Sequence, residues 1–193
     1  MICIDNKKEC CGCGACAQIC PKNCITMRAD DEGFIYPDVD KSLCIDCHLC
    51  EKRCPIQSMT NISEEYKNSF LGINKSETRL NSSSGGIFIL LANKIMSEGG
   101  VVFGAAYDEH FLVQHIVVES PDQLHLLMGS KYLQSSTGDF FQKAKNYLQE
   151  GRKVLFSGTA CQIAGLKSFL GKEYDNLWTV DVLCHGAPSP EVL

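Results

Sequence analysis

The chain contains one cysteine pattern twice. The spacing C-x2-C-x2-C-x3-C, followed directly by proline, occurs at residues 10–21 and again at residues 44–55, and each cysteine of the second copy lies 34 residues after its counterpart. A repeat that keeps its spacing indicates a duplicated structural unit. Three thiolates on such a tight loop each bind one iron of a [4Fe-4S] cube, while the fourth cysteine binds the other cluster.

The spacing therefore predicts two [4Fe-4S] clusters with crossed fourth ligands. The first ligand set is Cys10, Cys13, Cys16 and Cys54, and the second is Cys44, Cys47, Cys50 and Cys20. Structural zinc sites and a disulfide framework are the alternatives. Zinc sites use C-x2-C pairs separated by a longer spacer, whereas these eight cysteines form two uninterrupted tetrads, so the iron–sulfur interpretation is favoured. A zinc-stabilised binding module would instead be a colourless protein.

Cysteine usage also divides the chain. Eleven of the thirteen cysteines lie in the first 54 residues, which predicts a ferredoxin-type domain over residues 1–58, a polar linker over 59–68 and a second domain over 69–193. Cys3, Cys11 and Cys24 lie off the motif spacing and are expected to be unligated buried thiols. His48 lies inside the second tetrad and is expected to modulate that cluster by hydrogen bonding.

Charge and hydropathy exclude several classes of partner. The net charge is −5, and neither part of the chain carries an excess of basic residues, so nucleic acid is not an expected partner. No apolar run approaches the length that spans a bilayer. Because so many thiols must stay reduced, the expected location is a reducing cytoplasm, that of an anaerobe.

Hydrophobic periodicity predicts an α+β protein, in which the cluster domain precedes an α/β domain with a mixed sheet. A short hairpin is expected over 25–36. Beyond it, the predicted strands are 69–73, 101–107, 112–119, 153–156 and 177–183, and the predicted helices are 84–97, 121–128, 139–150 and 160–170. The last strand, helix and strand form a βαβ unit. His110, His115 and His125 are expected on the surface or on a strand face.

The βαβ unit predicts the positions of two cysteines near the end of the sequence. Cys161 and Cys184 follow its two parallel strands, so both are expected at the sheet edge where α/β proteins bind ligands. Cys161 also lies in the first turn of a helix, where the helix dipole favours a thiolate. A nucleophile with His185 as base, a ligand of a third cluster together with Cys184, and a small core residue all remain open for it.

Three glycine-bearing junctions are candidate sites for an anionic ligand. Ser83, Ser84, Gly85 and Gly86 precede the predicted helix at 84–97; Gly129, Ser130, Lys131 and Tyr132 follow a helix; Gly158, Thr159 and Gln162 lie at the strand-to-helix turn of the βαβ unit. Exposed helix N–H groups beside glycines can bind phosphate. Serine capping of the helix explains the first junction equally well without a ligand.

These junctions, followed by Cys184-His185-Gly186-Ala187-Pro188-Ser189-Pro190 and preceded by the tetrads, resemble the coenzyme F-420 hydrogenase/dehydrogenase beta-subunit family. The resemblance implies an iron–sulfur flavoprotein oxidoreductase with FAD at the three junctions. It also implies a redox partner protein or subunit, and a deazaflavin coenzyme or another small molecule as substrate. Lys131 would then stabilise negative charge on the reduced flavin.

Two departures from the family pattern affect these expectations. The family commonly has proline where this chain has Ala160, and its members continue for about as many residues again. We therefore expect the second domain to be C-terminally incomplete, with catalysis weakened or lost. The alternative function is a ferredoxin-like electron carrier fused to a non-catalytic interaction domain without flavin.

Overall fold

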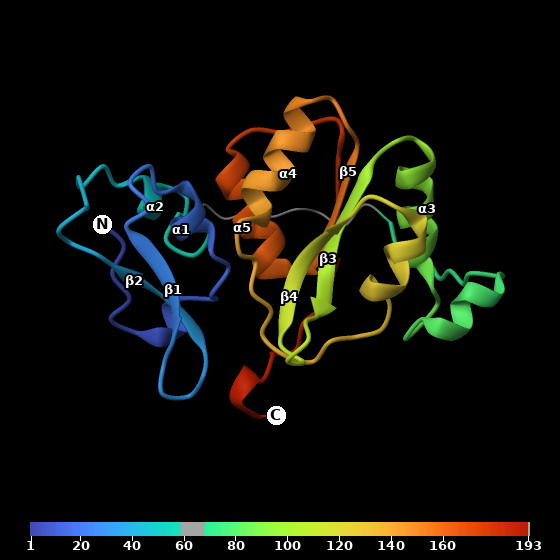
Figure 1. The fold of residues 1–193 in the computed structure, drawn as a ribbon, viewed down its shortest axis with the longest axis horizontal. Helices are drawn as coiled ribbons and strands as arrows, with labels where there is room; N and C mark the ends of the chain where they lie inside the picture. The colour runs from blue at the N-terminus through green and yellow to red at the C-terminus, as the bar shows by residue number, and fades with distance from the viewer. Residues whose placement is uncertain (59–67, 193) are drawn as a thin grey trace.

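The computed structural model describes residues 1–58 and 68–192. An N-terminal lobe of residues 1–58 lies beside an α/β part that begins at residue 68, and helices α4 and α5 of the α/β part face the lobe (Figure 1). The predicted linker at 59–68 falls outside the described residues except for residue 68. Among the described ranges, no helix is long and apolar enough to cross a membrane.

The N-terminal lobe is built around a β-hairpin. Strand β1 (Ile25–Ala29) pairs antiparallel with β2 (Ile35–Val39), which confirms the predicted hairpin. The carboxylate of Asp30 accepts hydrogen bonds from the Glu32 and Phe34 amides at 3.0 and 2.9 Å and closes the turn. The lobe also has the 3₁₀ helix η1 (Lys7–Glu9) and two short helices, α1 (Ala15–Ile19) and α2 (Leu49–Lys52).

The α/β part has a four-stranded mixed sheet in the order β4-β3-β5-β6. Its strands are β3 (Val101–Tyr107), β4 (Val113–Val118), β5 (Val154–Thr159) and β6 (Leu177–Val182), and its helices are α3 (Ile87–Ser97), α4 (Phe140–Gln149) and α5 (Ala160–Leu170). Strand β3 pairs antiparallel with β4 and parallel with β5, and β5 pairs parallel with β6 across α5. The predicted α+β class, mixed sheet and βαβ unit are thus confirmed.

Alternating strand residues cover the two faces of the sheet with different helices. Phe103 and Phe156 are fully buried against α4 and α5, where Phe141 also packs. Val102 and Leu155 point to the opposite face, against α3 and the 3₁₀ helix η3 (Pro121–Leu127). Since both faces are covered, the central strands are continuous apolar runs, as expected for buried parallel strands.

Three element predictions differ from the structure. Residues 69–73 form no strand: Phe70 is 91% exposed and has no sheet neighbour among the described residues. Gly72 instead packs against Ile87, and the Asn74 amide bonds the Gly85 carbonyl at 2.7 Å. The helix predicted from residue 84 begins at Ile87. The segment 121–127 is a 3₁₀ helix rather than an α-helix. Two further 3₁₀ helices among the described residues are Glu77–Asn81 and Pro190–Val192.

The two lobes share one hydrophobic core. Cys13 and Ala15, from the first cysteine loop, belong to the same buried cluster as Phe103 and Phe156 of the sheet. Helix α1 contacts both α4 and α5. The boundary predicted near residue 60 therefore separates two parts that are packed together, and their status as separate domains stays a prediction.

His115 lies in strand β4, in line with the strand-face alternative, and its side chain is fully buried rather than on the surface. Its ring stacks on Phe156 with centroids 5.2 Å apart, and its Nε2–H donates to the Ser157 carbonyl at 3.0 Å. Its Nδ1 has no hydrogen-bond partner within the described part of the chain. Burial lowers the pKa of His115 below its ordinary value.

We expect this buried imidazole to make the fold sensitive to mild acid. The unfolded chain protonates His115 below pH of about 6.5, while the folded protein resists that proton, so stability falls as the pH drops through that value. Between pH 7.5 and 5.5, wild type should lose up to about 1 kcal/mol more unfolding free energy than His115→Gln. Urea unfolding at the two pH values measures this. The exposed-site variant His110→Gln should behave as wild type, and an identical pH slope in His115→Gln would contradict the expectation.

Candidate metal centres

The repeated sequence folds into a repeated backbone. Gly12 and Gly14 of the first loop have φ of 65° and 75°, and the equivalent residues of the second loop, Asp46 and His48, have φ of 51° and 59°. Left-handed backbone is common for glycine but costs other residues about 1–2 kcal/mol. Both loops hold this conformation, so the backbone geometry belongs to the motif rather than to its glycines.

Backbone amides point at cysteine sulfurs in the same way in both loops. The amide two residues after Cys10 and the amide two residues after Cys44 each donate to that cysteine's Sγ at 3.4 Å. The Ile2 amide donates to the Cys50 Sγ at 3.3 Å. Such N–H···S bonds stabilise thiolate ligands and tune the potential of an iron–sulfur cluster. The loops thus have the surroundings that cluster ligands require.

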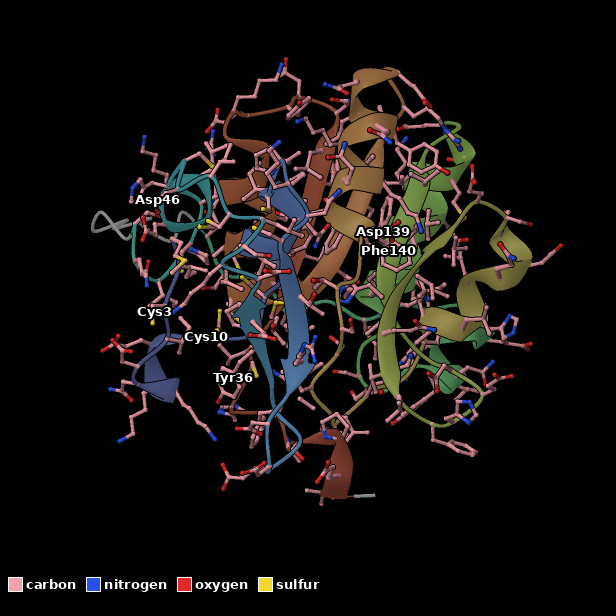
Figure 2. The ribbon with its side chains drawn as sticks, turned by 60° about the vertical axis from the view of Figure 1, so that its left-hand side comes forward. Cys3, Cys10, Tyr36, Asp46, Asp139 and Phe140 are labelled. Carbon is pink, nitrogen blue, oxygen red and sulfur yellow. The ribbon has the colours of Figure 1, made fainter. Side chains whose placement is uncertain are left out.

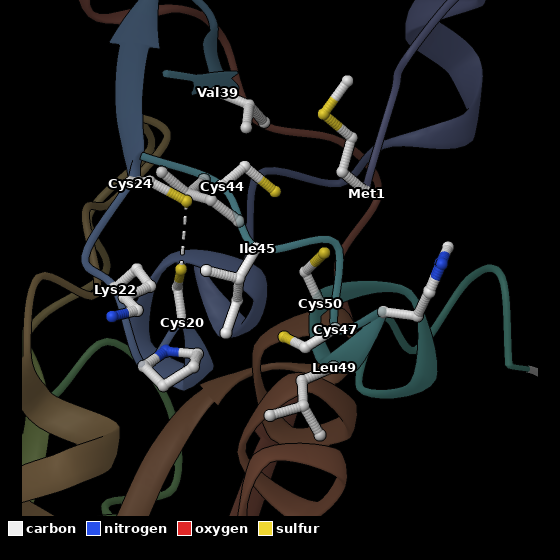
Figure 3. A pocket seen from close by; sticks show the side chains of 13 residues that line it. Met1, Cys20, Lys22, Cys24, Val39, Cys44, Ile45, Cys47, Leu49 and Cys50 are labelled. Atoms are coloured by element: carbon white, nitrogen blue, oxygen red, sulfur yellow. Dashed lines mark hydrogen bonds between the residues drawn. The ribbon is translucent and has the colours of Figure 1, made fainter. Parts of the chain in front are cut away.

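The fourth cysteine of the first tetrad lies with the second tetrad. Cys20 lines one pocket together with Cys44, Cys47 and Cys50 (Figure 3). The remaining lining of this pocket is largely apolar and includes Met1, Ile25, Val39, Ile45 and Leu49. Four thiols that line one mostly apolar pocket agree with the crossed assignment of a [4Fe-4S] cluster. Among the described residues, no three or more His, Cys, Asp or Glu side chains are arranged to hold a single metal ion. The ligand assignment itself stays a prediction.

A fifth thiol occupies the same pocket. The Cys24 Sγ lies 3.3 Å from the Cys20 Sγ, and it is buried, as expected for a thiol outside the motif. A hydrogen bond with the Cys20 thiol, with burial, raises the pKa of Cys24 to about 11. Cys3, in contrast, is exposed rather than buried, and its thiol bonds the Asp5 carboxylate at 3.3 Å.

The first ligand set gathers around Cys16. Burial, followed by the proximity of Cys10 and Cys54, raises the pKa of the Cys16 thiol to about 12. Cys54 and Cys50, both from the second tetrad, also raise this pKa, and the three sulfur residues share one buried cluster, so the two tetrads lie close together. Iron binding would have to displace the proton of such a thiol, so cluster assembly should depend on pH. The Cys13 sulfur differs, because it packs against Gly165 of α5.

Helix α5 brings one thiol of the α/β part to the first loop. The Cys161 thiol lies near the Cys11 thiol and 3.1 Å from the Thr159 hydroxyl. The contact with Cys11 and burial raise the pKa of Cys161, so the predicted thiolate at this helix start is wrong. A hydrogen bond with Cys13 raises the pKa of Cys11 to about 12, although the bond with Cys161 opposes this.

Cys184 lies at the same sheet edge as Cys161, because β5 and β6 are parallel and each cysteine follows its strand. It is exposed, and its Sγ accepts the Gly186 amide at 3.4 Å. The edge placement is as predicted. The nucleophile and third-cluster roles of Cys161 and Cys184 stay predictions.

Two of the predicted glycine junctions meet. The Ser130 amide donates to the Ser83 hydroxyl at 2.7 Å. No side chain of the described residues caps α3, so the alternative in which Ser83 or Ser84 caps this helix is wrong. Gly86 begins this helix with φ of 71°, and a Cβ on Gly85 would lie 2.7 Å from the Gly72 carbonyl oxygen. Close backbone packing thus explains these glycines without a ligand.

Lys131 is the positively charged residue of the second junction, residues 129–132. Its Nζ donates to the carbonyls of Leu126 and Met128 at 3.1 and 2.8 Å. Burial lowers its pKa to about 8, so it loses its proton far more readily than a solvated lysine. Tyr132 beside it is exposed, and Gly129 has open space where a side chain would be.

The third junction is held by its own side chains. Gln162 is buried; its Oε1 accepts the Thr159 amide at 3.0 Å, and its Nε2 donates to the hydroxyl and carbonyl oxygens of Ser135. Thr159 and Gln162 form a capping box at the start of α5. A Cβ on Gly158 would lie 2.9 Å from Gln162 and 3.4 Å from His115. Gln162 is thus engaged by the fold.

The residues that dock the lobes were missed by the sequence analysis. The Gln18 Oε1 accepts the Phe141 amide at 2.9 Å at the start of α4, and the Thr137 hydroxyl donates to the Cys13 carbonyl at 2.8 Å. Arg53 donates to the Ser168 carbonyl at 3.1 Å near the end of α5. These partners lie more than 100 positions apart, so no local pattern marks them.

Figure 2 shows Asp46 on the outer side of the N-terminal lobe, and Asp139 and Phe140 at the start of α4.

Comparison with known proteins places the N-terminal region in a described class. Residues 9–58 match the 4Fe-4S dicluster domain family. Over 56 residues the chain is 36% identical to an uncharacterized ferredoxin of Methanocaldococcus jannaschii, covering 29% of this chain and 71% of the relative. It is 38% identical over 56 residues to a 7Fe ferredoxin of Hydrogenibacillus schlegelii, covering 28% of this chain and 65% of that relative. A putative ferredoxin-3 of Sinorhizobium fredii is 59% identical over 29 residues, which are 15% of this chain and 28% of the relative.

These matches bear on the predicted cofactors. The dicluster match supports two [4Fe-4S] clusters in the N-terminal lobe, as the tetrads predict. The family match covers residues 9–58, which form the cluster lobe. FAD binding and the specific resemblance to F-420 beta subunits stay predictions.

Proposed function

We propose that this iron–sulfur electron carrier exchanges electrons with a flavin bound by its α/β part. The chain belongs, through residues 9–58, to the 4Fe-4S dicluster ferredoxin family. The observation that carries this proposal is the docking of the first cysteine loop into the core of the α/β part. When bound, the clusters supply one-electron transfer. The chain supplies ligands, N–H···S bonds and a fixed orientation between its two lobes.

The proposed ligands are the two crossed sets. Cys20 with Cys44, Cys47 and Cys50 would hold the outer cluster, which the shared pocket supports. The interaction of Cys16 with Cys10 and Cys54 supports the first set, in which Cys13 is the remaining predicted ligand. The backbone amides that donate to Cys10, Cys44 and Cys50 would stabilise thiolate charge and so raise the cluster potentials.

Helix α5 favours the first cluster as the one that exchanges electrons with the α/β part. The first loop reaches α5 at Cys161 near the start and at Gly165 in the middle, while Arg53, at the end of the second repeat, reaches Ser168 near the end of the helix. The second loop carries the exposed Cys47. A redox partner protein or subunit would therefore meet the second cluster.

The proposed flavin site is the junction pair joined by the Ser83–Ser130 hydrogen bond. Bound FAD supplies the conversion of single electrons into two-electron reduction. The amides at the start of α3 are not capped by described side chains and could bind phosphate oxygens, and Lys131 adds a nearby cation. The resemblance to F-420 beta subunits also supports FAD, and a deazaflavin coenzyme or another small molecule would be the substrate.

A titration with FAD tests this proposal. Protein reconstituted anaerobically with iron and sulfide, with its iron content measured, should quench flavin fluorescence on binding. Lys131→Ala should weaken binding about tenfold or more, because a hydrogen bond to a charged group contributes about 1.5–3 kcal/mol. The exposed Lys172→Ala, just after the end of α5, is the matched control and should bind as wild type. Cluster-loaded protein that leaves flavin fluorescence unchanged would contradict the flavin proposal.

A second candidate has its own support. Gln162 is satisfied by Thr159 and Ser135, and Gly85 is explained by its approach to Gly72. These contacts leave part of the predicted flavin site with purely structural roles. They favour an electron carrier whose α/β part is a non-catalytic interaction domain, which would carry clusters and bind no flavin.

A further inference from the structure

Exposed apolar side chains gather on the second cysteine loop. Leu43 and Ile45, the two neighbours of Cys44, are 55% and 58% exposed. Cys47, a predicted ligand of the second cluster, is exposed as well. Single exposed apolar residues need no explanation, but a group of them at one place marks a contact site for another molecule. Here the group lies where the second cluster comes closest to the solvent.

Three lysines lie around these apolar side chains. Lys22 lines the same pocket as Ile45 (Figure 3). Lys41 precedes Ile45 on the same loop, and Lys52 ends helix α2, which follows that loop directly. All three lysines are exposed, and none of them forms an ion pair with a carboxylate in the described ranges.

The carboxylates of this loop, in contrast, have partners within it. An oxygen of Asp46 lies 3.5 Å from the His48 Nε2, and an oxygen of Glu51 lies 2.5 Å from the His48 Nδ1. The lysines are thus left to interact with another molecule. An apolar centre with a charged rim is the usual composition of a protein interface, and a rim of lysines complements an acidic surface.

We propose that this surface docks an acidic redox protein, which exchanges single electrons with the second cluster. The inference rests on the proposed function, in which a redox partner meets that cluster. One electron leaves one centre and enters the other, so one centre is oxidised as the other is reduced. The surface is called the lysine-rimmed face below, and it consists of Leu43, Ile45, Cys47, Lys22, Lys41 and Lys52.

The two parts of the lysine-rimmed face should depend differently on salt. Complementary charges steer two proteins toward each other and so raise the association rate, and dissolved ions screen this attraction. Burial of apolar surface is driven by its removal from water rather than by charge. Loss of the lysines should therefore matter at low salt, and loss of the apolar centre should matter at any salt concentration.

Stopped-flow mixing with a bacterial flavodoxin, an acidic one-electron acceptor, tests the face. Cluster-loaded protein is reduced anaerobically, freed of reductant by gel filtration and mixed with oxidised flavodoxin. At low salt, where the Debye length is about 30 Å, Lys22→Gln/Lys52→Gln should exchange electrons at least about threefold more slowly than wild type. Where the Debye length is about 3 Å, near 1 M salt, the two rates should agree within about twofold.

A second variant tests the apolar centre. Leu43→Ser/Ile45→Ser should exchange electrons at least about threefold more slowly than wild type at both salt concentrations. Each variant has a matched control in the α/β part. Lys75→Gln/Lys172→Gln removes the same charge, and Leu80→Ser removes a side chain that is 84% exposed. Both controls should exchange electrons as wild type does.

Three results would overturn the proposal. One is an equal loss of rate in Lys22→Gln/Lys52→Gln and Lys75→Gln/Lys172→Gln, which would assign the steering to net charge. Another is a wild-type rate in the apolar variant. The third is a loss with cytochrome c, a basic acceptor, as large as that with flavodoxin. Iron content and the bleaching of visible absorption on reduction report the electron-carrier function separately, and a failed FAD titration would leave these rate differences unchanged.

Discussion

Pairs of cysteine substitutions should distinguish crossed from uncrossed cluster ligation by iron content alone. Wild-type protein reconstituted anaerobically should contain about eight irons per chain. If ligation is crossed, Cys16 and Cys54 serve one cluster, so Cys16→Ser/Cys54→Ser should retain about four irons. Cys47 and Cys54 then serve different clusters, so Cys47→Ser/Cys54→Ser should retain almost none.

The physical reason is that each cube needs all four thiolates, one for each iron at its corners. The shared pocket of Cys20 with the second tetrad, and the closeness of Cys54 to Cys16, motivate the expected order. Iron and acid-labile sulfide analysis with visible absorption measures the result, and circular dichroism checks that both double variants fold. Cys3→Ser, which removes an exposed thiol, should retain about eight irons. The reverse order of the two double variants would establish uncrossed ligation.

Exchanging residues between the two loops at one repeat position should have opposite consequences. Gly14→His places the second loop's residue in the first loop, where a Cβ would lie 2.6 Å from the Thr137 hydroxyl. That hydroxyl is held by its bond to the Cys13 carbonyl. Left-handed backbone costs about 1–2 kcal/mol and overpacking about 1–3 kcal/mol, so we expect about 2–5 kcal/mol of destabilisation.

The reverse exchange, His48→Gly, is the matched control. His48 is exposed with φ of 59°, and its Nδ1 lies 2.5 Å from the Glu51 carboxylate. Relief of backbone strain offsets the loss of this weak surface pair, so stability should stay within about 1 kcal/mol of wild type. Urea unfolding free energies measure both variants. Equal effects from the two exchanges would show that the lobe contact at Gly14 does not constrain the first loop.

The elements that the sequence predicted correctly are those with a strong local signal. The tetrads and their common spacing indicated two equivalent loops, and the structure repeats even the left-handed residues at Gly12 and Asp46. Strand β3 and helix α5 were predicted at their observed bounds, Val101–Tyr107 and Ala160–Leu170, because continuous apolar runs and helical periodicity mark buried elements.

The wrong predictions share one cause, which is that tertiary contact decided the outcome. The apolar run at 69–73 was predicted to be a strand. In the structure Gly72 packs against Ile87, and Phe70 and Leu71 are exposed. His115 was predicted on the surface or on a strand face; it lies in strand β4, but its stacking on Phe156 in the core was not predicted. The Cys161 thiolate was expected from its helix position, and the contact with Cys11 reverses that expectation. None of these partners is near in sequence.

The shared core of the two lobes has a consequence for how electrons move. A freely diffusing carrier must present a cluster to its donor and then to its acceptor, so its rate depends on two encounters. Here Cys13 and Ala15 are buried with Phe103 and Phe156, and one side of the cluster lobe is permanently occupied by its own chain. If the α/β part is the acceptor, as proposed above, the encounter at the loop that carries Cys47 is the one left to diffusion. On that proposal the lobe would act as a fixed relay rather than a shuttle, and its throughput would depend on a single docking event.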